Sequence, residues 1–130
     1  MRLWWLAAVV LTGLASAQTL HWHTSLTQAW QDAAKTHRPL AVLVVGRYCG
    51  WCRKLEREVL RDTAVQRRLS QYVTVKIVDD DTKTMRHLPP IEMVPTLFVY
   101  APNRKLVDTI VGYYPRNDYL DLLLEASEVR

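Results

Sequence analysis

The two cysteines of the chain, Cys49 and Cys52, lie between two segments with different hydrophobic patterns. Residues 40–45 are an unbroken apolar run, which predicts a fully buried β-strand. After the cysteines, Leu55 and Val59 recur at the spacing of an amphipathic helix. A buried strand followed at once by a helix, with the cysteine pair at their junction, constrains the fold more than any other feature.

The spacing of the cysteines predicts a redox-active pair. Side chains three residues apart on the first turn of a helix face the same side, so they can close a local disulfide. Cys49 lies where unpaired backbone N–H groups and the helix dipole favour a negative charge. We therefore expect Cys49 to have a lowered thiol pKa and to be the nucleophile. Arg47, Arg53 and Lys54 add positive charge nearby.

Residues 1–17 have the pattern of a cleavable signal peptide. A positive start at Arg2 precedes an apolar run over residues 3–14, and residues 15–17 are a small-residue cleavage site. The run is shorter than the roughly 20 residues of a membrane-spanning helix, although an uncleaved membrane anchor is the alternative. We expect a mature domain of residues 18–130 that is exported to a periplasm.

The expected export and the composition limit the roles that the cysteine pair and the chain can have. Cysteines in an oxidising compartment are usually structural, but a bridge that closes so short a loop stabilises a domain little. The chain of 130 residues carries a formal net charge of +4, and removal of Arg2 with the signal peptide makes the mature chain slightly less positive. Because lysine and arginine do not cluster as a nucleic-acid surface requires, we expect no nucleic-acid partner.

The order of the expected elements predicts an α/β fold. Strands separated by helices are expected to pair in parallel, and the last two form an antiparallel hairpin. A mixed central β-sheet with helices on both faces follows. The expected elements are an extended lead-in at 18–23, a helix from Thr24 or Ser25 to His37, the strand 40–45, a long kinked helix through Leu69 with a second cap at Asp62 or Thr63, a strand at 72–78, a short helix at 82–88, strands at 96–100 and 105–111, and a final helix capped by Asn117 or Asp118.

Three further motifs complete a pattern with the cysteines. Residues 48–52, Tyr-Cys-Gly-Trp-Cys, precede by some 45 positions the segment Val94-Pro95-Thr96, which opens a strand. Lys76 lies in the strand between, and Val111-Gly112 follows the hairpin. With these motifs the chain resembles the thioredoxin superfamily over essentially its whole mature length. The resemblance implies a thioredoxin-like fold in which the Val94–Pro95 bond is cis.

The resemblance also implies roles for individual residues. Cys49 and Cys52 are the catalytic pair and form the redox-active disulfide Cys49–Cys52, with no bound cofactor and no metal. The backbone of Val94 pairs with an extended substrate segment near the reactive sulfur. The substrate-binding residues implied in this way are Tyr48, Gly50, Trp51, Val94 and Pro95.

Residues 49–62 together with Val65-Gln66 resemble a narrower group. These are exported thioredoxin-related proteins, similar to the C-terminal domain of the periplasmic thiol-disulfide interchange reductase. The likeness implies a disulfide reductase that acts on protein or small-molecule disulfides and is reduced again by a membrane electron-transfer partner. With one cysteine pair and no coiled-coil seam, we expect a monomer.

The chain departs from thioredoxin at the position of its buried acid, which is Leu43 here. That acid assists deprotonation of the second cysteine, so another base or water must serve. Lys76 also loses its usual partner, which Glu56 or the run Asp79–Asp81 can replace; otherwise that run is a solvated strand end. Met93 alters the surface next to the predicted cis-proline.

Two alternatives remain open from the sequence. One is a thiol oxidant of the DsbA type, although the mature chain has no room for the inserted helical domain of such oxidants. The other is a copper-binding chaperone module that uses the Cys-x-x-Cys pair. His21 and His23 share a face but are expected to be a surface lead-in. Tyr113 either closes the substrate groove or caps the final helix.

Overall fold

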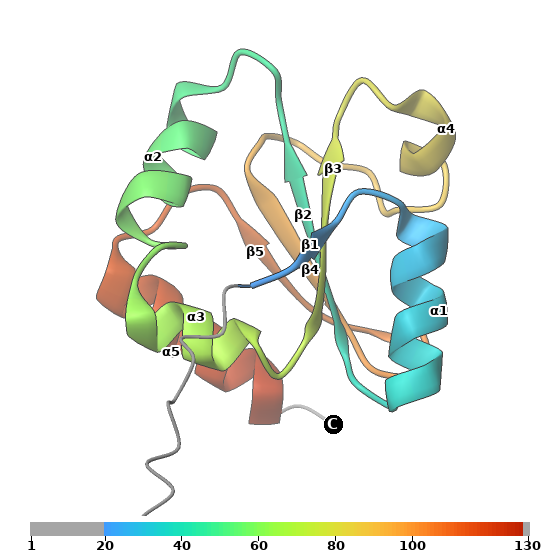
Figure 1. Ribbon diagram of the computed structural model, residues 1–130. Helices are drawn as coiled ribbons and strands as arrows, with labels where there is room; N and C mark the ends of the chain where they lie inside the picture. Colours follow the sequence, from blue (N-terminus) through green and yellow to red (C-terminus); the bar gives the residue numbers. More distant parts are fainter. Residues whose placement is uncertain (1–19, 129–130) are drawn as a thin grey trace, which may run out of the picture.

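The central strand of the sheet is β2 (Leu40–Val45), whose residues are all buried. It pairs in parallel with β3 (Val73–Val78) and antiparallel with β4 (Thr96–Tyr100). The short β1 (Trp22–His23) and β5 (Leu106–Val111) lie at the edges, which gives the order β1-β3-β2-β4-β5 (Figure 1). An apolar strand without alternation is what a strand covered on both faces requires.

The computed structural model describes residues 20–128, so the predicted signal peptide and its cleavage site lie outside the described residues. Within this range, no helix is both long enough and apolar enough to cross a bilayer.

Helices cover both faces of the sheet (Figure 1). α1 (Leu26–Thr36) and the short α4 (Thr82–Met85) lie on one face. α2 (Gly50–Glu58), α3 (Thr63–Leu69) and α5 (Arg116–Glu128) lie on the other. The predicted fold class, a mixed sheet between two helical layers, is confirmed.

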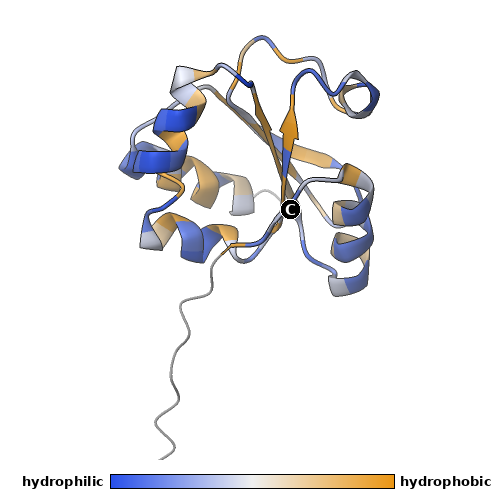
Figure 2. Ribbon diagram, turned by 45° about the horizontal axis from the view of Figure 1, so that its top comes forward, coloured by the Kyte–Doolittle hydropathy of each residue, from blue (hydrophilic) through white to orange (hydrophobic). Residues whose placement is uncertain are grey.

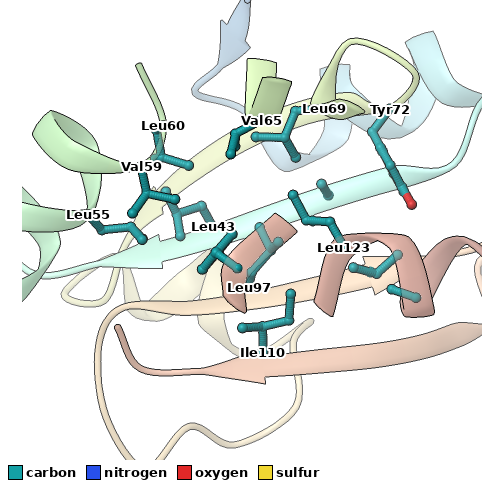
Figure 3. Packing of buried hydrophobic residues seen from close by; sticks show 14 of the residues in the cluster. Leu43, Leu55, Val59, Leu60, Val65, Leu69, Tyr72, Leu97, Ile110 and Leu123 are labelled. Atoms are coloured by element: carbon teal, nitrogen blue, oxygen red, sulfur yellow. The ribbon is translucent and has the colours of Figure 1, made fainter. Parts of the chain in front are cut away.

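The larger core lies between the sheet and the layer of α2, α3 and α5 (Figure 3). Leu43 of β2 is fully buried there, in the same cluster as Cys52 and Leu55 of α2. This core fixes the first turn of α2, and with it the cysteine pair, against the end of β2. The other labelled members are Val59, Leu60, Val65, Leu69, Tyr72, Leu97, Ile110 and Leu123.

Side-chain caps start the helices where the sequence predicts. Ser25 Oγ accepts a hydrogen bond from the Gln28 amide at the start of α1. Asp62 accepts from two amides at the start of α3. Each cap pairs backbone N–H groups that have no partner inside the helix.

The long kinked helix expected after the cysteines is two helices. Asp62 has extended backbone angles, φ −64° and ψ 135°, and its carboxylate caps α3 as predicted, so α2 and α3 are separate. The final helix begins earlier than expected, at Arg116 directly after Pro115. Asn117 and Asp118 therefore lie inside its first turn and are not its caps.

The expectation of parallel pairing is wrong for β4. Both the last residue of β3, Val78, and the first residue of β4, Thr96, lie at the same end of β2. The link between them contains only the four-residue α4, which is too short to carry the chain back along the sheet. β4 therefore runs antiparallel to β2.

Candidate active site

Cys49 and Cys52 form a disulfide at the start of α2, with their Cα atoms 5.2 Å apart. Cys49 is the N-cap residue, and its Sγ accepts a hydrogen bond from the Cys52 amide at 3.0 Å. Cys52 is 4% exposed, whereas Cys49 is partly open to solvent. Of the two sulfurs, that of Cys49 is therefore the one that a partner can reach.

The segment before β4 faces the reactive sulfur. The Val94–Pro95 peptide bond is cis, and the Val94 carbonyl oxygen lies 3.7 Å from Cys49 Sγ. Gly112 holds this segment, because its amide donates to the Pro95 carbonyl at 2.7 Å while its own φ is +87°. Such a φ favours glycine. Thr96 Oγ1 adds a hydrogen bond to the Met93 carbonyl at 2.8 Å.

Aromatic side chains surround the disulfide on the side of α2. Tyr48 is 96% exposed and Trp51 is 59% exposed. The Trp51 ring lies 5.5 Å from that of Tyr113, and Lys54 Nζ lies about 5 Å from both ring centres. The Tyr113 hydroxyl donates to Glu58 at 2.7 Å, which raises the pKa of Tyr113. Tyr113 thus belongs to the surface around the disulfide, which we call the aromatic surface (Trp51, Lys54 and Tyr113).

A shallow hollow of about 500 Å³ opens beside Cys49. Pro95 is buried behind Val94 and does not line it. The other predicted substrate-binding residues are therefore brought together at the sulfur, and their roles in binding stay predictions. The lining residues are Gly46, Arg47, Tyr48, Cys49, Gly50, Trp51, Asp79, Asp80 and Val94.

Carboxylates occupy the other side of this hollow. Asp80 binds Arg47, and this hydrogen bond raises the pKa of the guanidinium. A Cβ on Gly46 would lie 3.4 Å from Cys49 Cβ and 3.8 Å from Asp79 Oδ2, so both side chains lie next to Gly46. Asp79, Asp80 and Asp81 are exposed directly after β3, as expected of a solvated strand end, and Asp80 in addition pairs with Arg47.

A second ion pair lies behind the buried cysteine. Lys76 of β3 binds the carboxylate of Glu56, which is one helical turn after Cys52 on α2. Leu43 is the register partner of Lys76 and is fully buried. Of the two candidates for the missing partner of Lys76, the structure selects Glu56.

Other candidate ligands lie apart from the cysteines. His23 Nε2 lies 3.0 Å from an Asp32 carboxylate oxygen, and the rings of His21 and His23 are 4.8 Å apart. Among residues 20–128, no three histidine, cysteine, aspartate or glutamate side chains are grouped so that they could hold a metal ion.

Sequence reasoning missed Gly46 and Asp79 as site residues. A usable signal was present, because β2 and β3 are parallel and the residues after them meet at one edge of the sheet. No such sequence signal predicted that Lys54 contacts two aromatic rings, because Tyr113 comes from a loop distant in the sequence.

The fold and the exposed disulfide define a thiol:disulfide oxidoreductase. A family model described as a thioredoxin-like domain matches residues 26–127, and the chain belongs to this family. No curated protein matches the sequence significantly.

Several solved structures share the fold. A thioredoxin from Thermus thermophilus is 23% identical, with a TM-score of 0.70 over 85% of this chain and 88% of that one. A protein described as DsbH oxidoreductase is 14% identical, with a TM-score of 0.68 over 94% of both chains. The oxidised C-terminal domain of Neisseria meningitidis DsbD is 14% identical, with a TM-score of 0.64 over 85% of this chain and all of that one.

Proposed function

We propose that this oxidoreductase is an exported disulfide reductase that works in a periplasm. The signal-peptide pattern of residues 1–17 supports export. The observation that carries the redox function is the geometry of the pair, with Cys49 accessible beside the Val94 carbonyl and Cys52 buried behind it.

The reaction is two thiol–disulfide exchanges. The Cys49 thiolate attacks one sulfur of the substrate disulfide, and the other substrate sulfur leaves as a thiolate that takes up a proton. Cys52 then loses its proton and attacks Cys49 Sγ, which releases the second substrate thiol. The substrate gains two electrons, and the enzyme is left with the Cys49–Cys52 disulfide. A membrane electron-transfer partner supplies the two electrons that restore the dithiol.

The second exchange needs a proton acceptor for the buried Cys52. Glu56 is four residues after Cys52, so the two side chains share one face of α2. Lys76 binds the Glu56 carboxylate and holds it in place. Glu56 thus accepts the proton of Cys52, directly or through one water molecule. It does so in place of the buried acid of thioredoxins, whose position is occupied by Leu43 here.

One ion pair near Cys49 favours a reductant over an oxidant. A strong oxidant of this kind stabilises the thiolate of its reduced form. Here Asp80 neutralises Arg47, so this guanidinium stabilises a Cys49 thiolate less than an unpaired one would. Arg53 on the α2 side, by contrast, forms no ion pair within the described residues. The pairing of Arg47 therefore favours a lower reduction potential of the Cys49–Cys52 pair.

Turnover of a protein disulfide tests the redox function. The mature protein, supplied with a dithiol as electron donor, is expected to reduce insulin disulfides catalytically. Cys49→Ser should abolish this turnover, and Cys52→Ser should instead trap a mixed disulfide through Cys49. Full activity of Cys49→Ser would refute the proposed site.

A further inference from the structure

We infer that the aromatic surface and the outer face of α2 form one docking surface for a partner that carries acidic residues beside its disulfide. The inference rests on the proposed reductase function and names the partner class of the same site.

The outer face of α2 has an unbalanced positive charge. Arg53 and Arg57 are exposed and four residues apart, and the exposed Arg61 follows the helix. None of these arginines forms an ion pair within residues 20–128. Figure 2 shows this face as strongly hydrophilic.

The acidic residues of the same helix form no ion pair with these arginines. Glu56 is held by Lys76, and Glu58 accepts the hydrogen bond of Tyr113. Arg53 and Arg57 on α2, and Arg61 just beyond it, are therefore left to a partner. An unpaired basic stripe next to a reactive sulfur attracts carboxylates and speeds their approach.

The stripe begins at the reactive centre. A guanidinium nitrogen of Arg53 lies 3.9 Å from where a Cβ on Gly50 would be, so this charge lies next to the residue that follows Cys49. A carboxylate within a few residues of the target cysteine can therefore reach Arg53 while the disulfide contacts Cys49.

The aromatic surface supplies an apolar contact along the same path. Lys54 lies against both Trp51 and Tyr113, which places a third cation of α2 within this surface. The opposite side of the hollow carries Asp79, which forms no ion pair within the described residues, and the Arg47–Asp80 pair. The partner's carboxylates therefore lie toward α2.

Steady-state reduction of matched peptides tests this surface. Three disulfide-bonded peptides differ only in whether the residues flanking the cysteine are acidic, neutral or basic. At low ionic strength we expect the kcat/KM for the acidic peptide to exceed that for the basic one by about tenfold, and the ratio to approach one in high salt. The double variant Arg53→Glu with Arg57→Glu should remove or reverse the preference.

A control double variant, Arg67→Glu with Lys105→Glu, makes the same change in net charge away from the site and should keep the preference. Equal kcat/KM values for acidic and basic peptides, with the neutral peptide reduced well, would overturn this inference and leave the reductase function intact. Loss of the preference in the control as well would also overturn it, because net charge alone would then be its cause. Failure to reduce any of the peptides would refute the reductase function itself.

Discussion

Lys76 of β3 binds the carboxylate of Glu56, which lies one helical turn after the buried Cys52. The acid that pairs with Lys76 therefore comes from α2 rather than from β2. Leu43 of β2, the register partner of Lys76, is apolar and fully buried. In the proposed mechanism, Glu56 accepts the proton of Cys52 while Leu43 closes the core beneath it.

Replacing Glu56 tests this assignment. Glu56→Gln removes the proton acceptor and should slow the attack of Cys52 on the mixed disulfide by on the order of 100-fold at neutral pH. The rate should then rise steeply with pH, because Cys52 must ionise without help. Single-turnover kinetics with a chromogenic disulfide measure the step. The control is Glu58→Gln, which alters the neighbouring carboxylate that binds Tyr113. Resolution by Glu56→Gln at the parental rate and pH dependence would exclude Glu56 as the base.

Restoring an acid at position 43 should destabilise the protein. Leu43 is fully buried and Lys76 is already paired with Glu56, so an aspartate there loses apolar packing and has no ready partner. We expect Leu43→Asp to lower the free energy of unfolding by about 3–5 kcal/mol, as measured by urea denaturation. Leu43→Met, the control, should cost less than about 1.5 kcal/mol. Parental stability of Leu43→Asp would show that the core beneath Cys52 is open.

Removing the exposed indole should affect large substrates more than small ones. Trp51 is 59% exposed beside Cys49, where a protein partner can cover it. Trp51→Ala should lower kcat/KM for a protein disulfide by about tenfold while leaving the reduction of a small disulfide nearly unchanged. Leu106→Ala, an exposed apolar residue on the edge strand β5, is the control. An equal loss of kcat/KM on both substrates would show that Trp51 affects the reactivity of the cysteines rather than the binding of a protein partner.

Burial of Tyr119 gives the fold an alkaline limit. Its ring is 1% exposed, and burial raises the pKa of Tyr119 above the ordinary value of 10.0. The unfolded chain ionises first, so this contribution to stability is complete below about pH 10 and is lost as the pH rises further. Tyr119→Phe should remove up to about 1.4 kcal/mol per pH unit of that loss. Urea denaturation between pH 9 and 11 measures it, and an unchanged slope would contradict the assignment.

The parts predicted from the sequence are those set by local patterns. The limits of β2 follow from its uninterrupted apolar run, β4 lies where a strand after Pro95 was predicted, and the caps Ser25 and Asp62 act where their residue types predict. Predicting the cysteine pair at the strand–helix junction requires only the order of these elements. Local chemistry was therefore enough to place the reactive sulfurs.

The parts that could not be predicted depend on distant segments. The direction of β4 depends on whether residues 79–95 return the chain to the opposite end of the sheet. Local secondary-structure propensity does not determine this. The neutralisation of Arg47 by Asp80 needs β2 and β3 to end side by side. Tyr113 reaches Trp51 only after β5 has folded back along β4. Each of these contacts changes the charge or shape of the site, but no sequence pattern near the cysteines indicates it.

The reduction potential of the Cys49–Cys52 pair tests the central claim most directly. The mature protein is equilibrated with thiol–disulfide buffers of known potential, and the reduced fraction is read from the fluorescence change of Trp51 or by thiol alkylation. A reductant is expected to have a potential near that of thioredoxin, about −270 mV. A value near that of DsbA, about −120 mV, would contradict the reductase and make the protein an oxidant.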